Sequence, residues 1–250
     1  MISKLKCSVI TVCYNSEKTI IKNIESVNEQ THNNLEHIFI DGFSQDKTIS
    51  VIKNNSKVNN LIISEIDSGI YNAMNKGIIK STGDIIVFLN SDDWFAEKNS
   101  IANVIKKFSS NTEIVYGSID YFNIKKKIKS WRKFCPGEYY NRAYKSGWHA
   151  PHPAFFIRKK SIKKFFDESL NVSSDFDFMM YHQEIISCKS VYCPQIITTM
   201  STGGRSGNLS GMIIGNINIL KSIRRSYGFN FTQTFIFLIK RFFFKFASLR

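Results

Sequence analysis

Two adjacent carboxylates, Asp92 and Asp93, are the residues of this sequence whose type and spacing best suit chemistry. They follow an unbroken apolar run, residues 85–89, which begins after the turn residues Thr82 and Gly83 and predicts a strand buried on both faces. Ligands of open α/β sheets bind at the carboxyl ends of strands. Because a divalent cation relieves the repulsion between two carboxylates, and Mg²⁺ or Mn²⁺ is held by carboxylates and substrate phosphates, the pair predicts a metal–diphosphate site. Alternatively, both acids only favour the start of a following helix.

The segments that must position this pair alternate between strands and helices. Apolar, β-branched runs predict strands, and apolar residues at helical spacing follow most of them. This alternation indicates βαβ units with right-handed crossovers. We therefore expect a Rossmann-like α/β fold, with a mostly parallel sheet and helices on both faces. The expected strands of this part are 7–13, 36–40, 61–63, 85–89 and 114–116.

The alternation ends after Gly117. A hairpin is expected around the lysines at 125–127, and four glycines within 201–211 predict a loop. The remaining expected elements are strands at 119–124, 128–134, 153–157, 190–193 and 196–200, and helices at 175–186, 212–227 and 232–247.

The net charge of +14 is concentrated near the C-terminus, because nine Lys and Arg residues and no acidic residue follow Glu184. Segment 231–246 mixes seven phenylalanines with Lys240, Arg241 and Lys245. It is too short and too charged to span a bilayer, but it suits an interfacial helix that meets anionic headgroups. Packing on the domain or on a partner is the alternative, and the last two helices could equally form a homo-oligomer.

The five cysteines indicate reduced thiols in a cytoplasmic protein, because their number is odd and no CxxC occurs. Cys7 and Cys13 lie about 20 Å apart at the two ends of one expected strand, too far for a disulfide. The N-terminal apolar run is too short for a signal peptide, and no stretch of about 20 apolar residues is present to span a membrane. Together with the basic tail, this predicts a peripheral location on the inner face of the plasma membrane.

Five segments in order carry a resemblance to a known family: residues 11–17, 26–31, 40–48, 67–77 and 89–93. They read TVCYNSE, SVNEQT, IDGFSQDKT, DSGIYNAMNKG and LNSDD, and they resemble family 2 glycosyltransferases with the GT-A fold. Further on, Ser174-Asp175-Phe176-Asp177 is similar to the acidic-Asp-aromatic segment of the family, and residues 203–206 resemble its Gly-Gly loop. The subgroup that the chain resembles builds bacterial surface polysaccharides.

This resemblance implies an inverting, metal-dependent transfer of a sugar from a nucleotide diphosphate donor, expected to be a UDP-sugar. The acceptor would be a glycan or a polyprenyl-diphosphate-linked saccharide. On the donor side, the implied contacts are Tyr14 stacked on the base with Asn15 and Glu17 nearby, Asp41 on the base edge, Asp67 near ribose or diphosphate, and Lys76 at phosphate. The simpler interpretations are a loop aromatic, turn residues and a solvated lysine.

The resemblance also assigns the metal. Asp93 would be the direct ligand of Mn²⁺ or Mg²⁺, and Asp92 would contact metal, ribose or donor sugar. The cation would offset the negative charge that builds on the departing nucleoside diphosphate. Asn90 stands where many family members have a third acid.

Asp175 resembles the catalytic base, which would take the proton of the acceptor hydroxyl. Asp177 is the rival, although it should point elsewhere on the same helix, and Ser174 stands where relatives often have Glu. His149 and His152 bracket Pro151 and are expected near the acceptor or diphosphate, or else are structural.

Arg205, in the glycine-rich loop, would clamp the diphosphate when the loop closes. The expected organisation is a GT-A domain at 1–211, divided into a nucleotide-sugar-binding half (1–117) and an acceptor half (118–211), followed by C-terminal helices at 212–250. A catalytically inactive sugar-nucleotide-binding homologue is one alternative. A nucleic-acid-binding module is another, but its basic residues should spread over a face rather than gather beside phenylalanines, so no nucleic-acid partner is expected.

Overall fold

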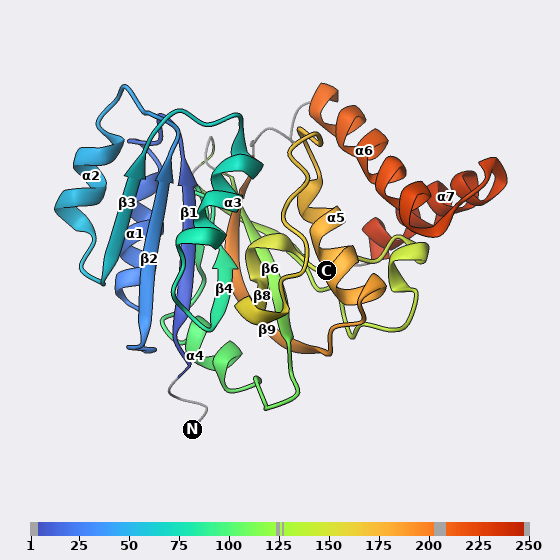
Figure 1. Cartoon of the computed structure of the whole chain (residues 1–250), viewed down its shortest axis with the longest axis horizontal. Helices are drawn as coiled ribbons and strands as arrows, with labels where there is room; N and C mark the ends of the chain where they lie inside the picture. Colours follow the sequence, from blue (N-terminus) through green and yellow to red (C-terminus); the bar gives the residue numbers. More distant parts are fainter. Residues whose placement is uncertain (1–4, 124–125, 127, 203–208, 248–250) are drawn as a thin grey trace.

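A mixed β-sheet forms the centre of the protein (Figure 1). The computed structural model describes residues 5–123, 126, 128–202 and 209–247. The strands are β1 (Cys7–Cys13), β2 (Leu35–Asp41), β3 (Asn60–Ser64), β4 (Ile85–Phe88), β5 (Trp94–Phe95), β6 (Ile114–Asn123), β7 (Ile128–Phe134), β8 (Phe155–Arg158) and β9 (Ser190–Thr202). Within the described ranges their order is β3-β2-β1-β4-β8-β6-β9-β5, and β7 pairs with β6 outside that path.

The helices lie on both faces of this sheet, as the alternation of apolar segments predicts (Figure 1). They are α1 (Ile20–Asn28), α2 (Thr48–Asn55), α3 (Ile70–Lys80), α4 (Ser100–Ile105), α5 (Ser174–Met180), α6 (Leu209–Tyr227) and α7 (Phe231–Ala247), with the short helices η2 (Ala143–Ser146), η3 (His152–Ala154), η4 (Lys159–Ser161) and the π-helix η5 (Tyr181–Ile185).

The first four strands of the sheet order are parallel, so their carboxyl ends meet at one edge. Strand β1 lies between β2 and β4. The chain therefore adds β2 and β3 on one side of β1 and later adds β4 on its other side. Such a reversal of strand order opens a crevice at the carboxyl ends, where ligands of doubly wound sheets bind. Strand β8 runs antiparallel to both β4 and β6, which joins the second half of the sheet to the first.

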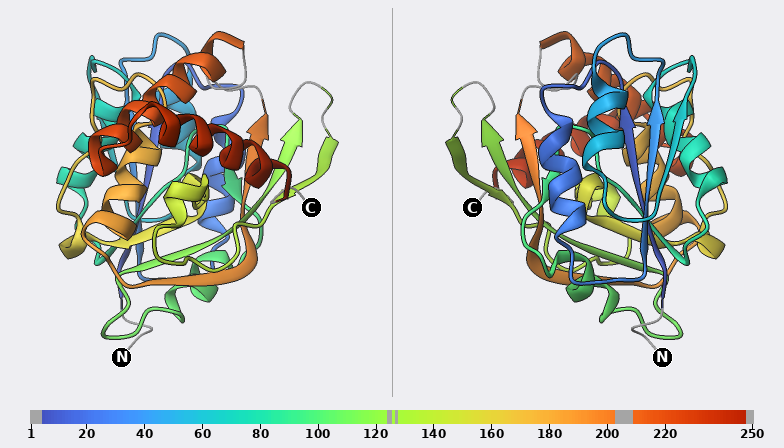
Figure 2. Two further views of the ribbon diagram at one scale, coloured as in Figure 1. Left: turned by 90° about the vertical axis from the view of Figure 1, so that its right-hand side faces the viewer. Right: turned by 90° about the vertical axis from the view of Figure 1, so that its left-hand side faces the viewer.

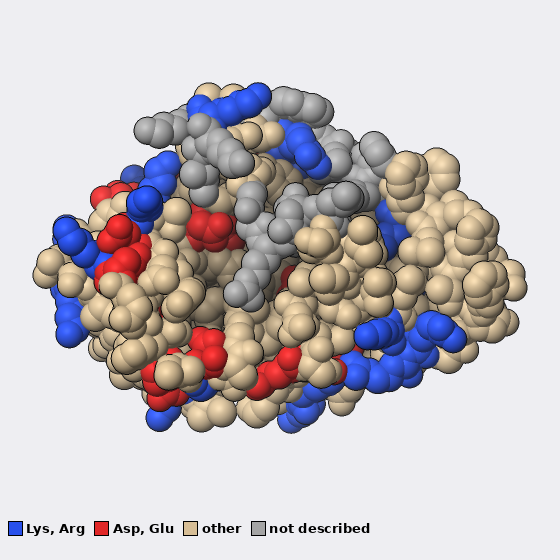
Figure 3. Space-filling view, turned by 90° about the horizontal axis from the view of Figure 1, so that it is seen from above, with Lys and Arg blue, Asp and Glu red and all other residues tan. Residues whose placement is uncertain are grey.

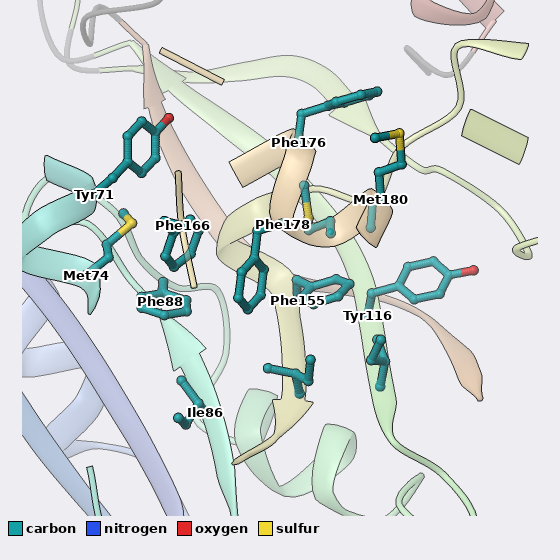
Figure 4. Packing of buried hydrophobic residues seen from close by; sticks show 14 of the residues in the cluster. Tyr71, Met74, Ile86, Phe88, Tyr116, Phe155, Phe166, Phe176, Phe178 and Met180 are labelled. Carbon is teal, nitrogen blue, oxygen red and sulfur yellow. The ribbon is translucent and has the colours of Figure 1, made fainter. Parts of the chain in front are cut away.

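Strand β4 shows why its sequence is apolar without alternation. Ile86 and Phe88 point into the core beneath α3 and α5, whereas Ile85 and Val87 point into the core beneath α1 and α4. Both faces of the strand are thus buried, as expected for a central strand covered on two sides. Figure 4 shows the first of these cores, where aromatic rings from several elements interlock above Phe88.

Several expected boundaries differ from the structure. The two strands expected at 114–116 and 119–124 are the single strand β6, and those at 190–193 and 196–200 are the single strand β9. The two strands pair in parallel along their length, and their register shifts between Gly117 and Ile119, so pairing bridges the break that the sequence suggests. The two-residue strand β5 was not expected from the sequence, because its pairing with β9 is tertiary.

The C-terminal helices pack against the second half of the sheet through buried side chains. Ile219 and Ile223 of α6 and Phe237 of α7 belong to the same core as α5. Arg225 of α6 also pairs with Asp177 of α5 at 2.8 Å. Within the described ranges, no helix has both the length and the apolar character required to cross a membrane. The domain division at residue 211 stays a prediction.

Candidate active site

The expected acidic pair lies in the tight loop after β4, at the carboxyl edge of the sheet. Asp93 is 1% exposed, and its Oδ1 accepts a hydrogen bond from the backbone N–H of Ser201 at 2.9 Å. Its Oδ2 accepts one from Nδ2 of Asn90 at 3.3 Å. The Ser201 hydroxyl in turn donates to the backbone carbonyl of Asp92. Seen onto this edge, the surface is hollowed and acidic residues line the hollow (Figure 3).

Burial makes the ionisation of this pair unfavourable. Desolvation raises the pKa of Asp93 well above its ordinary value, and the neighbouring charge of Asp92 raises it further. Desolvation also raises the pKa of Asp92. Neighbouring buried groups with strongly shifted pKa values are typical of functional sites.

The oxygen atoms of this loop suit a hard divalent cation. Asp92 and Asp93 supply carboxylates, and Oδ1 of Asn90 is buried with no hydrogen-bond partner among the described residues. Mg²⁺ and Mn²⁺ prefer oxygen ligands and commonly complete their coordination with substrate phosphates. The described residues contain no group of three or more His, Cys, Asp and Glu side chains that could hold a metal alone. The fit is therefore to a cation shared with a ligand.

A buried asparagine on α1 holds the acidic loop in place, and sequence reasoning missed it. The Nδ2 of Asn23 donates to the backbone carbonyls of Asn90 at 2.9 Å and Asp93 at 3.2 Å. Thr11 on β1 donates to the Asn23 side-chain oxygen at 3.3 Å. The available signal was a polar residue on the apolar face of a helix, beside Ile24. A fully buried amide needs partners, and the loop carbonyls supply them.

Tyr14 and Asp67 come together at the ends of β1 and β3. A Cβ built on Gly42 would lie 2.8 Å from Oδ2 of Asp67 and 3.4 Å from Cδ2 of Tyr14, so the glycine allows both side chains to approach. Tyr14 is 61% exposed, which leaves its ring free to stack on a ligand. Asp67 accepts a hydrogen bond from the Gly69 N–H at 2.9 Å, which is the Asx turn considered as its simpler role.

Asn15 and Glu17 connect the loop after β1 to the loop after β2. Oδ1 of Asn15 accepts a hydrogen bond from the Gln45 N–H at 2.9 Å, and Oε2 of Glu17 accepts one from the Lys47 N–H at 3.0 Å. Asn15 has a φ of 48°, a left-handed conformation that asparagine tolerates. These contacts order the wall beside Tyr14, and a direct contact with donor stays a prediction.

Asp41 lies deeper than its expected role suggests. It is fully buried, and its Oδ2 accepts hydrogen bonds from the Ser44 N–H at 2.9 Å and the Ser64 hydroxyl at 2.7 Å. Burial raises the pKa of the Cys13 thiol, and the charge of Asp41 raises it further. Asp41 thus organises the ends of β2 and β3 from within, and its contact with a base edge stays a prediction.

Lys76 and Arg205 complete the expected donor-side residues. The Nζ of Lys76 forms an ion pair with Oε1 of Glu65 at 2.8 Å and donates to the carbonyl of Ile66 at 3.2 Å. Its amine therefore fastens α3 to the loop after β3, and phosphate binding by it stays a prediction. Arg205 lies outside the described residues.

Asp175 lies in the first turn of α5, next to Tyr71 of α3. The hydroxyl of Tyr71, on α3, donates to Oδ1 of Asp175 at 3.4 Å. Burial lowers the pKa of His152, and the charge of Asp175 opposes that shift. His152 in turn stacks on Phe88 of β4 with ring centroids 5.5 Å apart. The structure thereby connects Asp175 to the strand that ends at the acidic loop.

Asp177, the alternative to Asp175 as catalytic base, has a structural role. It is 1% exposed and pairs with Lys164 at 2.5 Å and with Arg225 at 2.8 Å. Ser174, at the position where relatives often have Glu, is fully buried, and its Oγ has no partner within the described ranges.

The two histidines around Pro151 contact different rings. His149 stacks on Phe134 at 5.0 Å, whereas His152 stacks on Phe88. The Nε2 of His152 is buried with no hydrogen-bond partner in the part of the chain that the structure describes. The charge of Asp175 acts on His152, and His149 lies edge-on to Phe176, the residue that follows Asp175, with ring centroids 6.2 Å apart.

Sequence comparison with known proteins agrees with this arrangement. Residues 8–166 match the model of the family described as glycosyl transferase family 2. The chain is 25% identical over 234 residues to an uncharacterized glycosyltransferase of Mycobacterium tuberculosis, which covers 92% of this chain and 88% of that protein. It is 28% identical over 117 residues to a PGL/p-HBAD biosynthesis glycosyltransferase of Mycobacterium bovis, covering 45% and 46% of the two chains.

Solved structures show the same fold at lower identity. Staphylococcus aureus TarS 1–349 in complex with UDP-GlcNAc matches with a TM-score of 0.70 and 17% identity, over 96% of this chain and 73% of that one. The mannosyltransferase PcManGT from Pyrobaculum calidifontis, in complex with GDP-Man and Mn²⁺, matches with a TM-score of 0.69 and 16% identity, over 98% and 71%. The chain is thus a glycosyltransferase with the GT-A fold, and it belongs to glycosyltransferase family 2.

Proposed function

We propose that the chain is an inverting, metal-dependent transferase that moves a sugar from a nucleotide diphosphate donor, a UDP-sugar, to a glycan or lipid-linked saccharide in bacterial polysaccharide synthesis. The observation that carries this proposal is the buried pair Asp92 and Asp93, whose pKa values burial raises. Its support is the partly exposed carboxylate of Asp175, which accepts a hydrogen bond from the Tyr71 hydroxyl. The two structural neighbours that bind UDP-GlcNAc or GDP-Man with Mn²⁺ support the donor class.

In this proposal the donor lies at the carboxyl ends of β1 to β4. The exposed ring of Tyr14 would stack on the base, and Asp67 would approach the ribose or the diphosphate. A divalent cation held by Asp92 and Asp93 would supply electrostatic stabilisation to the departing nucleoside diphosphate. Asn23 would help to position the loop that carries both carboxylates, because it binds the backbone carbonyls of Asn90 and Asp93.

Asp175 would act as the catalytic base. It takes the proton of the acceptor hydroxyl while that oxygen attacks the anomeric carbon from the face opposite the diphosphate. One base and one leaving group give a single displacement, which inverts the anomeric configuration. The Tyr71 hydroxyl donates to Oδ1 of Asp175 and therefore keeps a fixed orientation of the carboxylate, so that Oδ2 can accept the proton.

We also propose that α7 rests on an anionic membrane surface, which brings a lipid-linked acceptor to the site. One face of α7 carries apolar side chains at the spacing i, i+4, i+7, i+8 and i+11, all of them exposed: Phe231, Phe235, Leu238, Ile239 and Phe242. The excess of basic residues after Glu184 complements anionic headgroups. Figure 2 shows α7 along the outer side of the molecule.

The alternative is a binding protein that holds a sugar nucleotide without catalysis. Asn90 and Ser174, which stand where relatives often have acids, keep this alternative in view. It predicts nucleotide binding without turnover.

The decisive test measures thermal stability with UDP, GDP, CDP or ADP, each with and without Mn²⁺. A ligand at 100 times its Kd that binds only the folded state adds about 2.7 kcal/mol to the free energy of unfolding. We expect a Mn²⁺-dependent increase with UDP that Asp93→Ala abolishes. No increase with any nucleotide would overturn the proposal, and an increase without turnover of UDP-sugars would favour the binding protein.

A further inference from the structure

Helix α7 carries Arg241 on the side that packs against the rest of the protein. Phe237, Arg241 and Phe244 lie at the spacing i, i+4, i+7, on the side opposite the exposed apolar face. Phe237 is 1% exposed, and Phe244 packs edge-on against Phe134 with centroids 6.2 Å apart. The sequence suggested that Arg241 would meet lipid headgroups, and that expectation was wrong, because the helix turns this residue inward.

The backbone of α7 meets the domain at Arg241. A Cβ built on Gly147, which has a φ of 85°, would lie 2.3 Å from the Cα of Arg241. Only a glycine allows this approach without a shift of the helix. The contact fixes the start of the arginine side chain at the domain surface, and its Cζ lies 5.3 Å from the ring centroid of Phe176.

Among the described residues, the guanidinium of Arg241 forms no ion pair, although the charge of Asp175 acts on it. Its Nη1 is buried and has no hydrogen-bond partner there. Arg225, on α6, shows the contrasting structural case, because Asp167 and Asp177 both pair with it at 2.9 and 2.8 Å. A buried guanidinium nitrogen without a hydrogen-bond partner is unfavourable, so a purely structural role would favour an uncharged residue of similar size.

The side chain lies close to the candidate base. Phe176, whose ring it contacts, directly follows Asp175 in α5. Burial lowers the pKa of Arg241 to about 10, and the charge of Asp175 opposes that shift. Arg241 therefore stays a cation at neutral pH, and Arg241 as a whole remains partly exposed.

We infer that Arg241 binds a phosphoryl oxygen of a diphosphate-bearing substrate beside Asp175. The inference rests on the proposed transferase function and adds a substrate contact from the helix that we propose to lie on the membrane. A guanidinium is planar, carries several N–H donors and forms bidentate hydrogen bonds with phosphate. The diphosphate could belong to the nucleotide donor or to a lipid-linked acceptor, and both have the same chemistry at this contact.

The test compares the wild type with Arg241→Met, which keeps most of the packing on Phe176, and Arg241→Lys, which keeps the charge. Arg224→Gln on α6 is the matched control, because that arginine is exposed and lies outside the proposed sites. Two probes are titrated: UDP with Mn²⁺ for the donor, and farnesyl diphosphate for the lipid diphosphate. We expect Arg241→Met to weaken one of them about tenfold to hundredfold, since a hydrogen bond to a charged group contributes about 1.5–3 kcal/mol. Arg241→Lys should lose less.

The probe that weakens identifies the source of the diphosphate. The melting temperature of Arg241→Met should equal or exceed that of the wild type, because a buried Nη1 without a hydrogen-bond partner is removed. Wild-type affinity of Arg241→Met for both probes would overturn the inference and leave the proposed function intact, provided that Asp93→Ala loses UDP. A lowered melting temperature with unchanged affinities would show that Arg241 is structural. If the wild type bound neither probe, the inference and the donor assignment would both fall.

Discussion

Asp175 is the residue on which the proposed chemistry depends most directly. We expect Asp175→Asn to lower kcat by about 10²- to 10⁴-fold, because an amide cannot accept the acceptor proton. Binding of UDP with Mn²⁺ should stay unchanged, since the donor site lies on β1 to β4. Asp177→Asn is the comparison: it should lower the melting temperature, because it weakens the pairs with Lys164 and Arg225. Equal kcat for Asp175→Asn and the wild type would exclude Asp175 as the base.

The acidic pair makes a prediction about pH. Burial raises the pKa of Asp93, so the folded protein must ionise a buried group that the unfolded chain ionises freely. This cost is absent at low pH and grows as the pH rises above the ordinary aspartate pKa toward the raised value. Without metal, Asp93→Asn should therefore be more stable than the wild type, by a margin that increases as the pH rises from about 4 toward the raised pKa of Asp93.

Chemical denaturation across that pH range, in EDTA and in Mn²⁺, measures this margin. Mn²⁺ should reverse the sign of this difference, because only the wild type has the Asp93 carboxylate that would bind the cation. A margin that does not change with pH, or an asparagine variant less stable in EDTA, would contradict the prediction.

At the scale of elements, α1 holds the loop after β4 through a single amide, that of Asn23. Asn23→Leu should lower the free energy of unfolding by about 1–3 kcal/mol, because the loop carbonyls of Asn90 and Asp93 lose their donor. It should also weaken the Mn²⁺-dependent binding of UDP. Glu25→Ala, on the exposed side of the same helix, is the control and should change neither. Loss of stability with unchanged binding would show that Asn23 supports the fold but does not position the carboxylates.

Helix α3 and the strands show how closely the two layers approach. A Cβ on Gly77 would lie 2.4 Å from Cγ2 of Ile10 on β1. We expect Gly77→Ala to destabilise the protein by about 1–3 kcal/mol through overpacking, despite the better helix propensity of alanine. Ile79→Ala, at an exposed position of α3, should have little effect in the same denaturation experiment. A neutral or stabilising Gly77→Ala would show that the layers can separate at no cost.

At the scale of the whole molecule, one hydrophobic core joins α7 to the strand that precedes the acidic pair. Phe235→Ser combined with Phe242→Ser should abolish sedimentation with vesicles that contain anionic lipid, while the melting temperature stays within a few degrees of the wild type, since both side chains are largely exposed. Phe237→Ser should instead lower stability by several kcal/mol, because that ring is buried. Vesicle binding that survives the double change would assign this face to another partner.

The sequence by itself determined the elements of the donor half and the position of the acidic pair. The strands at 7–13 and 85–89 were predicted because local apolar patterns are strong where both faces are buried, and parallel pairing then brings the carboxyl ends together. The family resemblance also marked Asp175 as a site residue.

Tertiary structure alone decided the rest, because it depends on contacts between residues far apart in the chain. Asn23 reaches the acidic loop only after α1 docks on the sheet, and Asp41 is enclosed only when Ser64 of β3 arrives beside it. The inward direction of Arg241 follows from the contact of α7 with Gly147, 94 residues earlier in the sequence. Local spacing predicts which side chains share a face of a helix, but the packing of distant segments decides which face is buried.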